Sequence, residues 1–151
     1  MFKITTEIDI DASAELVWRI LVDFARYPEW NPFIRQAQGE PRVGARLRVM
    51  IQPSGKSSMV FKPRVLKSEP GQELRWLGHL AFPGLFDGEH GFLLTPLPGG
   101  GCRLRQTEDF SGILVPLFKK SLETDTKRGF EEMNQALKTR AEQQAEGQGR
   151  S

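Results

Sequence analysis

The 151-residue sequence contains a single cysteine and no long hydrophobic run. Cys102 has no second cysteine for an intramolecular disulfide or a zinc knuckle, which disfavours a disulfide-stabilised secreted fold and favours a reducing compartment. No apolar stretch approaches the ~20 residues that a membrane span needs, and the N-terminus lacks the apolar core of a signal peptide. We therefore expect a soluble, cytoplasmic protein that makes no integral membrane contact.

A dominant charge of one sign is also missing. Lys and Arg number 21 against 19 Asp and Glu, which gives a net charge of +2, and the two signs are interleaved along the chain. Nucleic-acid-binding domains gather positive charge on one face, so this balance predicts no nucleic-acid partner. A chain of this length, with 38% hydrophobic residues, is a natural size for one domain with one core.

The motifs of common catalytic and cofactor sites are absent. The sequence has no nucleophile elbow, no P-loop, no Gly-rich dinucleotide fingerprint and no His/Cys/Asp cluster at metal-ligand spacing. His79 and His90 are the only histidines, and strand alternation places them on opposite faces. We expect no metal and no cofactor, and the sequence disfavours a hydrolase that pairs a His base with a Ser or Cys nucleophile.

Periodicity in the first third of the chain predicts a strand followed by two short helices. Residues 2–10 alternate apolar and polar side chains, which is typical of a half-buried strand. Apolar residues then recur at helical spacing over 14–23, and the Ser13 hydroxyl can cap this helix. Pro28 and Pro32 disfavour helical geometry at the residues before them, so at most a short second helix fits there.

Short β-like runs separated by turn residues occupy the middle of the chain. Six strands are expected there, and residues 2–10 bring the total to seven. Because Pro63 cannot donate a ladder hydrogen bond, it predicts a bulge or a sheet edge within its strand. The expected strands are 33–38, 46–52, 58–66, 74–80, 89–94 and 103–110.

From residue 113 the apolar period returns to 3.6, which predicts one long amphipathic helix. Glycine inside a helix costs about 1 kcal/mol relative to alanine, so Gly129 marks a place where the helix leaves room or approaches another backbone. Residues 142–151 are rich in Gln, Glu and Gly and are expected to fray.

Four parts of this pattern together resemble the START-like superfamily, also called SRPBCC or polyketide cyclase/dehydrase and lipid-transport proteins. They are the strand at 2–10, VWRILVDFARYPEWNPFI at 17–34, TEDFSG at 107–112 and KRGFEEMN at 127–134. The resemblance implies one α+β ligand-binding domain over residues 1–141 with a helix-grip fold. In that fold a curved seven-stranded antiparallel sheet wraps the C-terminal helix, two short helices lie between strands one and two, and an apolar cavity remains between sheet and helix. The superfamily includes carriers, receptors and cyclases, so it implies no single chemistry.

Polar residues occupy the inward faces of the last two predicted strands. Alternation places Gln106 and Glu108 inside on one strand and His90 inside on the other. A hairpin that closes around residues 98–100 brings His90 opposite Gln106 or Glu108. Three interpretations stay open: a satisfied polar network, a contact that orients a ligand, or a general acid/base in which Glu108 holds the His90 imidazole.

Large apolar side chains that face inward by parity or helical phase supply the walls of a pocket. Each one alone is more often plain core than a ligand contact, but as a set they favour a ligand site with a few polar groups. With His90, Gln106 and Glu108 they form the predicted ligand-binding set: Trp30, Phe33, Met59, Phe61, Trp76, Phe92, Phe110, Phe118 and Met133.

The sequence therefore favours the binding or transport of a hydrophobic small molecule, such as a lipid, a polyketide or an isoprenoid-like compound. Two alternatives stay open: a cyclase/dehydrase-type enzyme that uses His90 and Glu108 as its catalytic candidates, and a protein-interaction module. The apolar loop at 82–86 has two interpretations as well, a mobile lid or a loop packed onto the sheet. The sequence indicates no oligomeric state.

Overall fold

The computed structural model describes residues 2–149, and these contain eight strands rather than the predicted seven. In chain order the elements are β1 (Phe2–Ile10), α1 (Ala14–Val22), the 3-10 turn η1 (Phe24–Arg26), α2 (Tyr27–Trp30), β2 (Ile34–Gln38), β3 (Arg48–Ile51), β4 (Met59–Phe61), β5 (Arg64–Glu69), β6 (Glu73–His79), β7 (Asp87–Pro96), β8 (Cys102–Ser111), α3 (Val115–Ser121), the π-helical turn η2 (Leu122–Thr126) and α4 (Lys127–Gly149).

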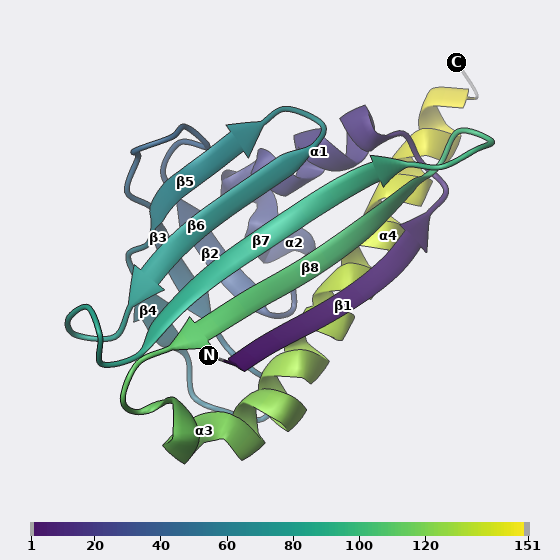
Figure 1. Cartoon of the computed structure of the whole chain (residues 1–151). Helices are drawn as coiled ribbons and strands as arrows, with labels where there is room; N and C mark the ends of the chain where they lie inside the picture. The colour runs from purple at the N-terminus through teal and green to yellow at the C-terminus, as the bar shows by residue number, and fades with distance from the viewer. Residues whose placement is uncertain (1, 150–151) are drawn as a thin grey trace.

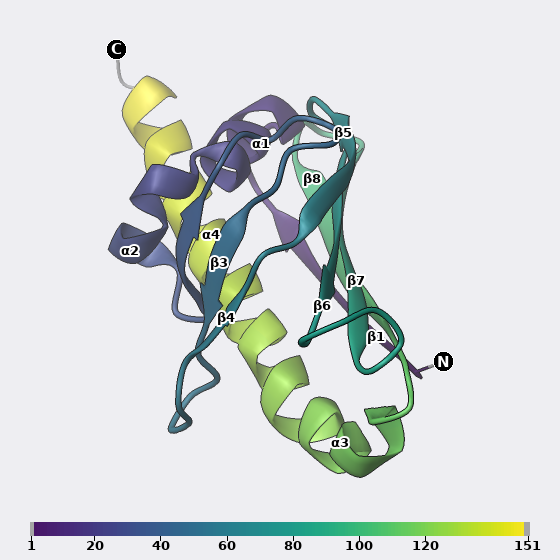
Figure 2. The ribbon, with the colours of Figure 1, turned by 90° about the vertical axis from the view of Figure 1, so that its left-hand side faces the viewer.

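The strands form two antiparallel sheets. One has the order β1-β8-β7-β6-β5 and the other the order β2-β3-β4. A bridge between Arg46 and Arg64 joins them, so the chain curves from one sheet into the other. Helix α4 lies along the face of the larger sheet behind β1 and β8, with α3 at its lower end (Figures 1 and 2). This is the α+β helix-grip arrangement that the resemblance implied.

The additional strand arises at Pro63. The predicted strand over 58–66 is divided there into β4 and β5, which belong to different sheets. Proline has no N–H to continue a ladder, but its carbonyl accepts a 2.8 Å hydrogen bond from the Leu47 N–H. The position predicted to be a bulge or an edge is therefore the corner at which the chain passes between sheets.

The two short helices between β1 and β2 are confirmed, and side-chain hydrogen bonds close their ends. The Ser13 hydroxyl accepts from the Leu16 N–H at 3.1 Å and caps α1. The buried Tyr27 hydroxyl donates to the Leu21 carbonyl at 2.5 Å, near the end of α1. The Asn31 amide oxygen accepts from two successive backbone N–H groups and directs the chain into β2.

The predicted single helix from residue 113 is instead three helical segments, because the π turn η2 separates α3 from α4. A π turn inserts one extra residue and is frequent at functional sites. Helix α4 continues past residue 142 to Gly149. Fraying of 142–151 stays a prediction, and residues 150–151 lie outside the described part of the chain. No helix within 2–149 is both long and apolar enough to cross a membrane.

Candidate ligand-binding site

A cavity of about 310 Å³ lies where β3, β4 and β6 to β8 face α3 and η2. Its walls are mostly apolar, and Val49 and Ile51 line it from β3. The structure brings together at this cavity most of the sequence-predicted set: Phe33, Met59, Phe61, Trp76, His90, Glu108, Phe110 and Phe118. Met59 and Phe118 are 47% and 43% exposed, so they lie at its open end rather than in the interior.

Four residues of the predicted set do not line this cavity. Phe92, Gln106 and Met133 are fully buried in the core behind it. Strand parity and helical phase correctly place them on the inward side, but they are not among the residues that line the open space. Trp30 lines a different hollow, between α1 and α4.

The loop at 82–86 is attached to the start of α3. Phe86 packs its ring against Phe110 and Phe118, with ring centroids 5.7 Å and 5.6 Å apart. The Ile113 and Leu114 N–H groups donate to carbonyls of the same loop at 3.1 Å and 3.0 Å. Phe86 lines the cavity, whereas Phe82 is exposed. Lid motion stays a prediction, and it would have to break these contacts.

His90 is the central polar group at the cavity wall. It is 1% exposed, Nδ1 lies 3.0 Å from Glu108 Oε1, and Nε2 lies 2.8 Å from Gln106 Oε1. The prediction that His90 faces Gln106 or Glu108 is thus confirmed for both. Trp76 stacks on the imidazole at a centroid distance of 5.3 Å, and the Phe130 ring lies 4.9 Å away. These rings hold the imidazole in one orientation.

The hydrogen bonds behind His90 fix the direction of each donor. The Gln106 amide nitrogen donates to Asn134 Oδ1 at 2.7 Å and lies 3.5 Å from the Phe130 carbonyl oxygen. The Asn134 amide nitrogen donates to the Thr6 hydroxyl at 2.8 Å. That hydroxyl in turn donates to the backbone carbonyl of Gln106 at 3.3 Å. Turning the Gln106 amide over would set its oxygen against the Phe130 carbonyl. In this orientation of the amide Gln106 Oε1 is the acceptor and His90 Nε2 the donor.

With Nε2 as the donor to Gln106, the contact between Nδ1 and Glu108 needs a proton of its own. An unprotonated Nδ1 and a carboxylate oxygen are both acceptors, and they would repel each other at 3.0 Å. The pair is consequently either an imidazolium with a carboxylate or a neutral imidazole with a carboxylic acid. The second oxygen of Glu108 has no hydrogen-bond partner among residues 2–149, and Glu108 lines the cavity.

Gly88 makes room for this carboxyl group. A Cβ at position 88 would lie 2.2 Å from Glu108 Oε2, so any other residue there would displace the carboxyl. Within the described chain no group of three or more His, Cys, Asp or Glu side chains could hold a metal ion. Beside the buried His90, the cavity wall therefore presents the hydrogen-bonded His90–Glu108 pair and the unpartnered second oxygen of Glu108.

An ion pair that the sequence did not reveal spans the cavity mouth. Lys56, from the turn between β3 and β4, has its Nζ 3.6 Å from Asp125 Oδ2 on η2, and both residues line the cavity. The two positions are far apart in the chain and neither has a distinctive local pattern. Their contact depends on the π turn, which periodicity does not indicate.

Known proteins of similar sequence and structure share this architecture. The family described as polyketide cyclase / dehydrase and lipid transport matches residues 1–142. Two solved structures are 25% identical to this chain: protein MLL2253 from Mesorhizobium loti (TM-score 0.68, covering 90% of this chain and 96% of that one) and a START superfamily protein from Mycobacterium smegmatis (0.73, 93% and 97%). None of the curated proteins matches this chain.

A third solved structure is similar to this chain in its fold alone. The Zhui aromatase/cyclase from Streptomyces sp. R1128 is 17% identical, with a TM-score of 0.78 and 95% of each chain covered. The family match covers nearly the whole sequence, and the solved relatives share the arrangement of sheet and C-terminal helix. This chain belongs to the START-like family of polyketide cyclase/dehydrase and lipid-transport proteins.

Proposed function

We propose that the protein binds a hydrophobic small molecule that carries one hydrogen-bond donor, such as a phenolic or alcoholic hydroxyl. The observation that supports this is the unpartnered Glu108 oxygen in the wall of an otherwise mostly apolar cavity. The volume of about 310 Å³ lies at the lower end of the 300–1,000 Å³ that is usual for ligand pockets. A compact ligand of one or two rings, or a short acyl chain, suits this space.

Glu108 offers such a ligand an unpartnered carboxyl oxygen beside the buried His90, whereas the lining residues Ser57 and Ser121 are exposed. Both ring nitrogens of His90 are already engaged, one by Glu108 and one by Gln106, so the imidazole has no free atom to offer. Lys56 and Asp125 lie at the mouth and pair with each other. A buried ligand hydroxyl that found no acceptor would lose its hydrogen bonds to water, so Glu108 selects for ligands with a donor.

A matched pair of ligands tests this role of Glu108. By calorimetry, 2-naphthol is expected to bind about tenfold tighter than 2-methoxynaphthalene, because only the former donates a hydrogen bond to a charged or acidic acceptor. Glu108→Leu should abolish that difference. Glu131→Gln, an exposed change on α4, should leave it intact. Equal affinity of the two ligands for the unmodified protein would refute the assignment of Glu108, and binding of neither would refute the carrier function.

The ion pair at the mouth should slow ligand release. Asp125→Asn removes the charge that holds Lys56 across the opening, and we expect release of N-phenyl-1-naphthylamine to accelerate by about two- to tenfold. Stability should change by less than about 1 kcal/mol, because exposed ion pairs contribute little. Stopped-flow fluorescence measures the rate. Glu40→Gln, which breaks the exposed pair with Arg42 far from the mouth, is the control and should leave the rate unchanged.

A second candidate function is an enzyme of cyclase or dehydrase type. The hydrogen-bonded pair of His90 and Glu108 lies beside the cavity, and such a pair can give a proton to a substrate and take one back. Ligand extracted from protein purified from its own host, identified by native mass spectrometry, supplies the substrate for the test. Unchanged turnover by Glu108→Gln and His90→Ala variants that still bind this ligand would exclude the enzyme.

A further inference from the structure

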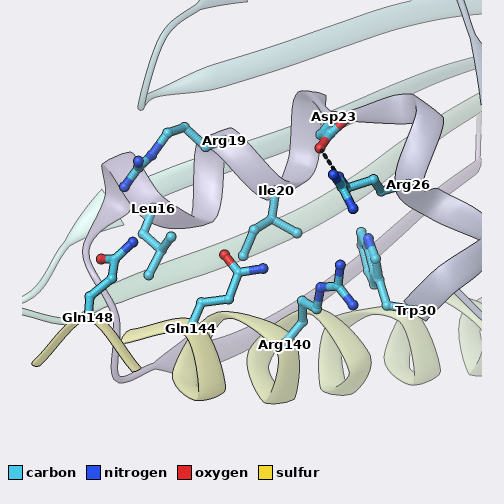
Figure 3. A pocket seen from close by; sticks show the side chains of 9 residues that line it. All are labelled: Leu16, Arg19, Ile20, Asp23, Arg26, Trp30, Arg140, Gln144 and Gln148. Carbon is cyan, nitrogen blue, oxygen red and sulfur yellow. Dashed lines mark ion pairs between the residues drawn. The ribbon is translucent and has the colours of Figure 1, made fainter. Parts of the chain in front are cut away.

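A second hollow of about 230 Å³ lies between α1 and α4 and shares no lining residue with the cavity described above (Figure 3). We call it the α1–α4 pocket. Its apolar part is formed by Leu16 and Ile20, which are buried on the inner side of α1. Trp30 from α2 closes one end and Arg140 rises beside it from α4. Neither the family match nor the proposed function uses this pocket.

The charged side chains around the α1–α4 pocket leave an excess of positive charge. Arg26 is 3.2 Å from the Asp23 carboxylate and 3.3 Å from the Glu29 carboxylate, and Arg140 Nη2 lies 2.7 Å from Glu29. The hydrogen bond from Arg140 lowers the pKa of Glu29, which keeps that group ionised. Arg19 has no ion-pair partner within residues 2–149. Three guanidinium groups therefore face two carboxylates.

Two buried N–H donors on the lining residues lack partners. Neither Trp30 Nε1 nor Arg140 Nε makes a hydrogen bond within the described chain, and both are shielded from solvent. Buried polar groups are almost always hydrogen-bonded, so a natural structure that leaves two such groups in the lining of one pocket calls for a partner. Because both groups are donors, the missing partner is an acceptor.

We propose that the α1–α4 pocket binds a small organic anion, whose carboxylate or phosphate oxygens pair with the guanidinium groups of Arg19 and Arg140 beside Trp30 while its apolar body contacts Leu16 and Ile20. Guanidinium groups are suited to both anions because their donors match the spacing of the oxygens. The pocket is smaller than the roughly 300 Å³ at which sites for drug-sized molecules begin, so the ligand has few atoms beyond its charged group. This inference is independent of the proposed function.

Amide NMR of the ¹⁵N-labelled protein tests the proposal with benzoate, phenyl phosphate and the uncharged analogue benzyl alcohol. The three indole N–H signals can be assigned from single Trp→Phe variants. Benzoate or phenyl phosphate should shift the Trp30 indole signal saturably, and the tighter of the two identifies the anion as carboxylate or phosphate. Benzyl alcohol should shift it by less than a tenth as much. The Trp76 signal, from the other cavity, should not move with the Trp30 signal.

Charge variants supply the decisive comparison. Arg140→Gln is expected to weaken anion binding about tenfold, as the loss of a charged hydrogen bond implies. Arg19→Gln, which changes an exposed side chain and should fold normally, is expected to weaken it about threefold. Arg35→Gln on β2 is the matched control and should have no effect. The proposal would be overturned if no anion shifted the Trp30 signal, or if benzyl alcohol shifted it as much as the anions do. It would also be overturned if neither Arg140→Gln nor Arg19→Gln weakened anion binding.

Discussion

Replacing Gln106 with leucine should destabilise the protein by about 2–4 kcal/mol. Gln106 is fully buried, accepts from His90 Nε2 and donates to Asn134 Oδ1. Leucine has nearly the same size but makes neither bond, so an N–H on His90 and an oxygen on Asn134 remain buried without partners. Each such group costs about 1–3 kcal/mol. Urea denaturation followed by circular dichroism measures the difference.

The opposite face of the same strand provides the control for this experiment. Arg105→Leu removes an exposed ion pair with Glu7 and should cost less than about 1 kcal/mol. In the double variant Gln106→Leu with His90→Phe, one of the two unpaired groups disappears, so part of the lost stability should return. A Gln106→Leu protein as stable as the unmodified one would show that the polar network is not closed as described.

The strand part of the polar network could be predicted from the sequence, because it depends on strand parity and on the position of one turn. The glycine-rich turn at 98–100 determines where the last hairpin closes. Alternation along the strands then places His90 and Glu108 on the same face and opposite each other in the register. The partners on α4 were not predicted. Asn134 lies on a helix whose phase is shifted by the π turn, and no local pattern indicates that turn.

Trp30 and the strand count show two other limits of sequence reasoning. The stretch at 17–34 correctly predicted two short helices and the buried Phe33, but it placed Trp30 at the ligand cavity. Four helical residues between two turns do not define which side chain faces inward. Pro63 marked the irregular position in its strand, whereas only the hydrogen-bond pattern shows that the chain changes sheets there.

Gly129 connects the C-terminal helix to the size of the cavity. A Cβ at this position would lie 2.2 Å from Cδ1 of Phe33 and 3.0 Å from its Cγ, so the ring itself would have to move. Phe33 is 2% exposed, its ring meets Phe130 at a centroid distance of 5.6 Å, and its backbone N–H is bound to Asn31. The open space available to the displaced ring is the cavity that Phe33 lines.

Gly129→Ala is therefore expected to destabilise the protein by about 1–3 kcal/mol, as overpacking does in other cores, although alanine favours helix by about 1 kcal/mol. Because the displaced ring enters the cavity, the affinity for 2-naphthol should fall about tenfold. Gly147→Ala in the same helix, with no atom within 4 Å of the new Cβ, should instead stabilise by up to about 1 kcal/mol. Adding Phe33→Leu to Gly129→Ala should restore both stability and affinity in part. If Gly129→Ala raised stability as Gly147→Ala does, contact with Phe33 would not be the reason for this glycine. Any loss of affinity for 2-naphthol would then not come from a displaced Phe33 ring.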